Sequence, residues 1–239
     1  MRQLRTYIIS LIVILTPSLG YTQDSLAVDT QDLLTVDTQD SLIAEQSNLA
    51  LNIYADVGKG FESLLNKQVK WEFGVSVLVF QKYHFSVEYG YGSLNPESVV
   101  NNGSYTSEGN YYRAGFEYVF TISLKRYLST GIMYSHANFT DNVNVKIASD
   151  LWDDVDETIK RTDLSASWIE WIVNTEAPVF MAEKGFFSNF YWGVRFRLRI
   201  LTSDIAQPDF DIFAIPGYGK TYSNVVPAAN LYIKYRIDF

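Results

Sequence analysis

Apolar and polar residues alternate without interruption over the last part of the chain, from Ala229 to Phe239. Every second side chain, starting with Ala229, is apolar, and the residues between them include Lys234, Arg236 and Asp238. Successive side chains of a β-strand point to opposite faces, so the pattern predicts a strand with one apolar and one charged face. In a soluble sandwich the charged face would meet water. In an outer-membrane barrel the charged face lines the interior and the apolar face meets lipid.

Similar alternation upstream predicts eight strands in total. Their expected ranges are 49–58, 68–80, 82–92, 109–121, 124–137, 164–177, 187–201 and 227–239. These lengths are close to the ~9–11 residues that a tilted strand needs to cross the hydrocarbon, and no run of about 20 apolar residues offers a spanning helix. Unpaired backbone N–H and C=O groups are costly in lipid, so we expect an even number of strands closed into a ring without free edges. We expect an all-β, eight-stranded antiparallel up-and-down transmembrane barrel.

The expected connections alternate in length. Only a few residues separate the second strand from the third and the fourth from the fifth, whereas 93–108, 138–163 and 202–226 are long and polar. Short turns at one end and long loops at the other are typical of outer-membrane barrels. We therefore expect long external loops and both termini in the periplasm. The connections 59–67 and 178–186 fit this rule less well.

The amino-terminus predicts export. Arg2 and Arg5 precede a short apolar run over residues 7–15, and small residues follow it. This order is typical of a cleavable signal peptide, which we place at 1–23, and the run is too short to span a bilayer as a helix. A buried amino-terminal helix is the alternative.

Residues 24–48 have a different composition. Three similar eight-residue stretches begin at Asp24, Asp32 and Asp40, and the segment contains neither Lys or Arg nor an aromatic residue. Such a segment has too little apolar surface to offset the entropy lost on ordering, so we expect an acidic, disordered periplasmic tether. An amphipathic helix on its leucines is the alternative. The barrel domain would then comprise residues 49–239.

The composition and net charge exclude several classes of partner and ligand. A net charge of −8 without a basic stripe argues against binding to nucleic acid. With two histidines and no cysteine, we expect no disulfide, no transition-metal site and no cofactor. Aromatic residues make up 15% of the chain and are candidates for interfacial girdles. The expected partners are outer-membrane lipid, lipopolysaccharide and the barrel assembly machinery.

Charged residues on the inward faces are the main candidate site, which we call the interior charge network. Its members are Asp56, Glu72, Glu88, Arg113, Glu117, Glu170, Arg195, Arg197, Arg199, Lys234 and Arg236. An eight-stranded interior can be filled by side chains, and unpaired charges in it would be costly, so we expect mutual neutralisation. The alternative is a cavity lined by Arg195, Arg197 and Arg199 that binds an anion. We also expect Arg197 and Arg195 on the seventh strand to face Trp168 and Glu170 on the sixth across the turn between these strands, giving a cation–π contact and an ion pair inside the barrel.

Two other groups of residues suggest chemistry only weakly. His84, Ser86 and Glu88 share one strand face, but a spacing of two residues separates neighbouring groups by roughly 7 Å, too far for direct hydrogen bonds. The acidic residues of 150–157 could offer oxygen ligands to Ca²⁺, but they lack the EF-hand spacing and its glycine. We expect no catalytic site and no metal site at either place.

The stretch GYGKT at 217–221 ends like a phosphate-binding loop. The first glycine of that motif would fall at Ala214, however, and Pro216 interrupts the stretch. We interpret it as a tight glycine turn leading into the last strand, with Pro216 fixing the approach.

Several motifs occur between residue 49 and the end of the chain. They are YADVGKGFESLL at 54–65, VEYGYG at 87–92, YYRAGFEY at 111–118, ASWIEWI at 166–172, GVRFRLRILTSD at 193–204 and IPGYGKTYS at 215–223. Together they resemble an uncharacterised outer-membrane barrel family of Bacteroidota, a domain of unknown function numbered 6048. IPGYGKTYS is its most specific part, and the tether lies outside the resemblance. The resemblance implies a small barrel of unassigned activity.

We expect a non-enzymatic integral outer-membrane barrel, structural or adhesive through its external loops. The alternative is a small barrel enzyme or a binder of an anionic ligand at the interior arginines. An enzyme would need His or Ser groups near the outer strand ends, where only His136 qualifies. A soluble barrel would expose too large an apolar belt. The alternating end Tyr235, Ile237 and Phe239 resembles the assembly signal of outer-membrane proteins.

Overall fold

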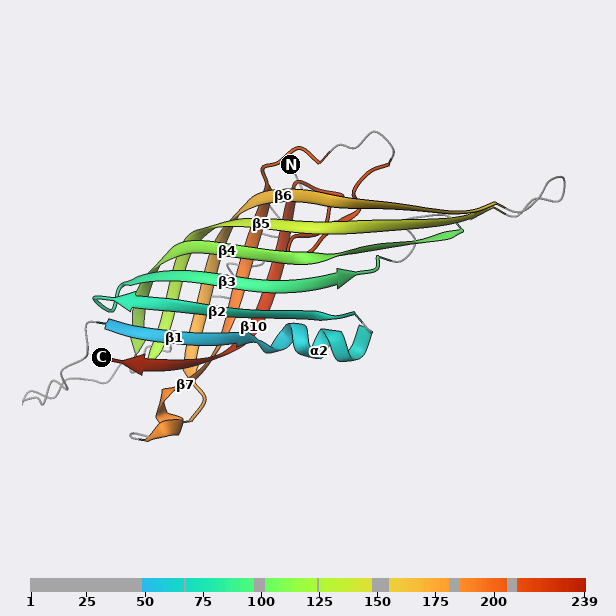
Figure 1. Ribbon diagram of the computed structural model, residues 1–239. Helices are drawn as coiled ribbons and strands as arrows, with labels where there is room; N and C mark the ends of the chain where they lie inside the picture. Colours follow the sequence, from blue (N-terminus) through green and yellow to red (C-terminus); the bar gives the residue numbers. More distant parts are fainter. Residues whose placement is uncertain are drawn as a thin grey trace, which may run out of the picture. The chain divides into compact units, whose positions relative to one another are not determined.

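The computed structural model describes residues 49–66, 68–96, 102–123, 125–147, 155–180, 185–205 and 210–239. Eight strands of this part form a closed antiparallel barrel in the order β1-β10-β7-β6-β5-β4-β3-β2 (Figure 1). The strands are β1 (Leu49–Asp56), β2 (Lys70–Val79), β3 (Tyr83–Leu94), β4 (Gly103–Ser123), β5 (Arg126–Ile147), β6 (Val155–Pro178), β7 (Phe190–Leu201) and β10 (Val225–Asp238). The expected all-β ring of eight antiparallel strands is confirmed. The expected signal peptide and tether lie outside the described residues.

Shorter elements occupy three of the connections. They are α2 (Val57–Asn66), the 3₁₀-helix η1 (Phe186–Asn189) and a small hairpin of β8 (Ala214–Ile215) and β9 (Gly219–Lys220). The start of β1 pairs with the end of β10, so these two strand ends lie at the same end of the barrel.

The alternation of the sequence accounts for the two surfaces of the barrel wall. On β2, Phe73 and Val75 are about half exposed, whereas Glu72 and Ser76 are buried. Each strand obeys the same period of two, since its successive side chains leave opposite faces of the sheet. The barrel is therefore polar inside and apolar outside.

The expected long loop 138–163 is largely strand, and half of 93–108 is strand as well, which corrects the predicted strand ends. β4, β5 and β6 contain 21, 22 and 24 residues, about twice the length needed to cross a bilayer. The period of two continues in the expected loop 138–163, with Phe139 and Val143 buried and Asn142 exposed between them, but the outer face is polar there, unlike that of the predicted strands. Cross-strand pairing also continues, as when Asn144 Nδ2 donates to Thr158 Oγ1 at 2.9 Å.

The expected loop 59–67 is also different, because helix α2 follows β1 directly. Asp56 Oδ1 accepts the backbone N–H of Lys59 at 3.1 Å and so caps the first turn. Gly58 and Gly60 are poor helix formers, which hid the helix in the sequence. Contacts with β2 and β10 hold α2 in place. None of the helices in the described ranges is long and apolar enough to cross a membrane.

Candidate functional site

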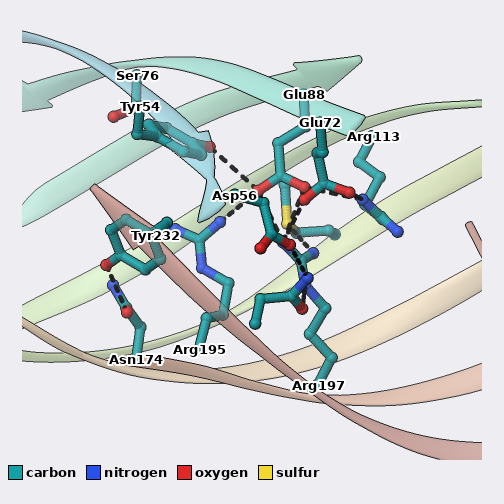
Figure 2. A network of polar contacts seen from close by, with 12 residues as sticks. Tyr54, Asp56, Glu72, Ser76, Glu88, Arg113, Asn174, Arg195, Arg197 and Tyr232 are labelled. Atoms are coloured by element: carbon teal, nitrogen blue, oxygen red, sulfur yellow. Dashed lines mark hydrogen bonds and ion pairs between the residues drawn. The ribbon is translucent and has the colours of Figure 1, made fainter. Parts of the chain in front are cut away.

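All eleven residues of the interior charge network lie inside the barrel, and Glu88 is at the centre of their contacts. Glu88 on β3 is fully buried. Its Oε2 accepts from Arg113 Nη1 at 3.1 Å and from Arg197 Nη2 at 2.8 Å, and its Oε1 accepts from Tyr54 OH at 3.1 Å. Arg195 forms a further ion pair with Glu88. Figure 2 shows these side chains converging from strands on different sides of the barrel.

Two further carboxylates neutralise the same arginines. Glu170 on β6 accepts from Arg113 Nε at 2.8 Å and from Arg197 Nη1 at 2.6 Å. Glu72 on β2 forms an ion pair with Arg113 and lies 3.4 Å from Arg197 Nη2. Each guanidinium therefore contacts more than one carboxylate, which offsets the cost of burying the charges.

Glu176 and Lys59 pair with members of the interior charge network but were not predicted, and neither was the buried Asp141. Glu176 lies on the inward face of β6, pairs with Lys234 and could have been found from its even spacing to Glu170. Lys59 reaches inward from α2 and pairs with Glu72, and no strand pattern could have revealed it. Burial lowers the pKa of Lys59, while the nearby carboxylate of Glu72 opposes this shift.

The expected pairing of β6 with β7 was wrong by four residues. Glu170 lies opposite Arg199 rather than Arg195, although the ion pair between Arg197 and Glu170 exists along a diagonal. Trp168 donates its Nε1–H to Glu170 at 2.6 Å and lies opposite Leu201. The register of a hairpin is fixed by its turn, and the connection here holds η1 instead of a tight turn.

In the described part of the chain, His84 is hydrogen-bonded to neither Ser86 nor Glu88. His84 Nε2 lies 3.0 Å from Asn52 Nδ2 and 3.1 Å from Ser76 Oγ, whereas no hydrogen-bond partner is found for Ser86 Oγ. Within the described ranges, no group of three or more His, Asp or Glu residues could hold a metal ion. Residues 148–154, which include part of the acidic loop, lie outside the described residues.

The segment IPGYGKTYS belongs to the connection between β7 and β10. It lies at the end of the barrel where β4 begins and β5 ends, which we call the barrel mouth. We call residues 210–220 the mouth plug. Its turn at Pro216–Tyr218 agrees with the expected glycine turn, but Ile215 and Tyr218 are fully buried. They pack in one apolar cluster with Tyr111 and Trp168, and the ring centroids of Trp168 and Tyr218 are 5.6 Å apart.

Two interior arginines hold the mouth plug by its backbone. Arg113 Nη2 donates to the carbonyl of Gly217 at 2.9 Å, and Arg199 Nη1 donates to the carbonyl of Tyr218 at 2.7 Å. Gly217 has a φ of +80°, and a Cβ there would lie 2.5 Å from the ring of Tyr111. Only glycine fits this position, which explains why the segment carries one.

A pocket of about 430 Å³ lies beside the mouth plug. Its lining includes Lys59 of α2, Lys70 of β2, Tyr91 of β3, Arg199 of β7 and Ala228 of β10. Two carboxylates, Asp56 and Glu62, also line it, so the pocket combines charges of both signs with aromatic and small apolar side chains, a lining suited to binding.

Comparison with known proteins supplies a family. The family model described as a domain of unknown function, DUF6048, matches residues 4–239 and thus includes the segment 24–48, which the sequence analysis had left outside the resemblance. No curated protein matches the chain. Among solved structures, the chain is similar to the N-terminal β-barrel domain of OprF from Pseudomonas aeruginosa, with 10% identity, a TM-score of 0.35, and coverage of 80% of this chain and 99% of that one. On the match over residues 4–239, this chain belongs to the DUF6048 family.

Proposed function

We propose that this chain is a non-enzymatic integral outer-membrane protein, a barrel closed by its interior ion pairs and its mouth plug. Its extended strands would present a surface outside the membrane. The observation that carries the proposal is the apolar belt on the outside of the ring, together with the sharp level at which this belt ends.

The belt is made of large exposed side chains. Among them are Phe73, Val75, Phe85, Val87, Tyr89, Tyr112, Phe116, Ile132, Tyr134, Ile169, Trp171, Trp192, Phe196, Leu231 and Ile233, all between 39% and 63% exposed. They come from seven of the eight strands. A soluble monomer rarely exposes an apolar surface of this extent, whereas lipid would cover it.

The belt ends at one level on neighbouring strands. On the outer face of β4, aromatic Tyr112 is followed towards the mouth by Asn110 and Glu108. Tyr112 pairs with His136 of β5, which in turn pairs with Ser167 of β6. The change from apolar to polar therefore follows a line across β4, β5 and β6, which is the pattern expected at an interface between hydrocarbon and water.

The interior supports a closed barrel over an open pore. Arg113, Arg195 and Arg197 are almost completely buried and each pairs with at least two carboxylates. An anion bound among them would have to displace Glu88 or Glu170. An anion site among Arg113, Arg195 and Arg197 is therefore the weaker candidate.

The parts of β4, β5 and β6 that extend beyond the apolar belt would lie in water. Asp141 of β5 is fully buried under Tyr105, whose OH donates to it at 3.1 Å, and it pairs with Arg161 of β6. Arg161 also lies over the ring of Phe210, 3.6 Å from its centroid, and so ties the mouth plug to the extension. This ordered surface, rather than flexible loops, would make contacts outside the cell.

The first prediction concerns location. Fractionation of cells should recover the full chain, after export, in the outer membrane. Unheated protein should migrate differently from heated protein in detergent gels, because a closed hydrogen-bonded ring resists unfolding. Release of the protein by a wash without detergent would contradict the proposal.

The second prediction concerns Phe239, whose side chain is 69% exposed and whose backbone N–H donates to Leu49 O at 3.1 Å. By burial alone its side chain would contribute at most about 1–3 kcal/mol. If it belongs to an assembly signal, deleting it should reduce the amount assembled in cells far more than it lowers the unfolding free energy of protein refolded in detergent. Deletion that lowers both measurements equally little would show that Phe239 only packs.

A further inference from the structure

Near the mouth, strand-to-strand hydrogen bonding is interrupted in the barrel wall between β10 and β2. We call this interruption the seam. The pairing of β1 with β10 ends at Asp56 and Tyr232, while β10 continues to Val225 with β7 as its only strand neighbour. Residues 225–231 therefore present one edge that no strand of the described chain covers. Pro227 lies in this stretch, as is typical of an edge position, where a missing N–H is tolerated.

Helix α2 fills the seam in place of a strand. It continues from the end of β1 beside β2 (Figure 1) and contacts both β2 and β10. Phe61 and Leu64 on its outer side are 63% and 82% exposed. Lys59 on its inner side pairs with Glu72. A helix packed by side chains separates from its neighbours more easily than a strand bonded through its backbone, so the seam is the weakest line of the wall.

The pocket beside the mouth plug lies in this seam. Its apolar side is formed by Leu94 of β3 and by Ala228, Ala229 and Leu231 of β10. Ala229 and Leu231 belong to the outer face of the wall, whereas Asn230 between them is buried. The pocket thus reaches from the outer, apolar face of the barrel to its charged interior.

One cation of the pocket lacks a full set of partners. Lys59 and Lys70 each form ion pairs with acidic residues of their own surroundings. Arg199 is only 8% exposed, yet its Nε has no hydrogen-bond partner. Its nearest carboxylate, Glu170, lies 3.6 Å from Nε and is shared with Arg113 and other arginines. A buried donor without a partner is costly, and an anionic group in the pocket would supply one.

We propose that the seam pocket binds an amphiphile with an anionic head group, which reaches Arg199 sideways between α2 and β10 while its alkyl chain lies along the apolar outer face. The proposal rests on the proposed function in one respect, namely that the outer belt faces lipid. It explains the two-sided lining, the incompletely paired cation and the use of a helix where a strand would close the wall.

A reversible disulfide provides the sharpest test, because the chain has no cysteine of its own. A Cβ built on Gly58 would lie 3.5 Å from Leu231 Cβ, a separation that suits a disulfide, and Asp56 Oδ1 at 3.2 Å would need to shift slightly. Gly58→Cys with Leu231→Cys should therefore lock α2 to β10 on oxidation. Each single cysteine variant and the reduced double variant are the matched controls.

The measurement is binding of dodecyl phosphate to the full-length protein in a neutral maltoside detergent. The reduced double variant, which has the same two substitutions in the pocket lining, is the reference for the oxidised one, and oxidation should slow association at least about tenfold relative to it. Inorganic phosphate and dodecyltrimethylammonium should bind at least about tenfold more weakly than dodecyl phosphate, because each lacks either the chain or the negative charge.

A charge variant tests the same site without a disulfide. Arg199→Gln should weaken dodecyl phosphate binding at least about tenfold, as expected for the loss of a charge-assisted hydrogen bond. Lys220→Gln removes the same charge from an exposed position on the mouth plug that does not line the pocket, and it should leave binding within about twofold.

Each contrary result has a distinct meaning. Unchanged association after oxidation would overturn sideways access, and equal binding of inorganic phosphate would show that the occupant is a small anion from solution. No binding of dodecyl phosphate, or equal binding by Arg199→Gln, would overturn the site. Because binding is measured on purified protein and location on cell fractions, failure here is distinguishable from failure of the proposed function.

Discussion

Replacing Glu88 with alanine is expected to lower the free energy of unfolding by about 3–5 kcal/mol, the cost of breaking a buried ion pair. Glu88 is fully buried and contacts Arg113, Arg195 and Arg197. Without it, three guanidinium groups would share the remaining carboxylates in a site that water does not reach. Urea unfolding of the protein refolded in detergent measures the loss.

Glu108→Ala is the matched control for Glu88→Ala. Glu108 is also a glutamate on the barrel wall, but it is exposed and only accepts a 3.4 Å hydrogen bond from Tyr91. Its removal should change the unfolding free energy by no more than about 1 kcal/mol. The double variant Glu88→Ala with Arg195→Met should be destabilised by less than the sum of the two single variants, because the ion pair between Glu88 and Arg195 can be lost only once. Equal losses for Glu88→Ala and Glu108→Ala would refute the central role of Glu88.

Replacing Gly217 with alanine is expected to displace the mouth plug. A side chain at this positive φ is strained by about 1–3 kcal/mol. The new Cβ would also lie 2.5 Å from the ring of Tyr111, which adds about 1–3 kcal/mol of overpacking or forces the turn out of the mouth. Limited proteolysis should cleave within residues 210–224 much faster than in the unaltered protein, and the unfolding free energy should fall.

Gly219→Ala separates these two causes. Gly219, also within the mouth plug, has a positive φ of +110°, but the atom nearest to the position that a Cβ would occupy is Val226 Cγ1 at 3.8 Å, an ordinary contact. Alanine at this position should be strained by the positive φ but should not clash with a neighbouring side chain, so the mouth plug should stay protected from protease. If both variants expose residues 210–224 equally, the contact between Gly217 and Tyr111 does not hold the plug.

The sequence alone determined which side chains face inward. The period of two is a property of extended backbone itself, so once a strand is recognised, the side on which Glu88 or Arg197 lies follows from its residue number. The same local rule places Phe73 and Phe116 outside. For this reason the polarity of the wall and the whole interior charge network could be predicted without knowing how the strands pair.

The ion-pair partners and the strand lengths were decided by contacts between segments that are distant in the sequence. Which carboxylate meets which arginine depends on the register of β6 with β7, and η1 replaces the tight turn that would have fixed it. The inner faces of the extended β4 and β5 pack against the mouth plug through Tyr105, Val143 and Ala214, a contact between segments far apart in the sequence.

The burial of the mouth plug and the position of helix α2 also could not be predicted from the sequence alone. Gly217 marks a turn in the sequence, but its burial against Tyr111, more than a hundred residues earlier in the chain, is visible only in the folded barrel. Helix α2 contains two glycines and is held by its cap and by the strands beside it. Local pattern therefore determined the face of each residue, whereas the fold determined the partners, because pairing energies arise between segments that the chain brings together only on folding.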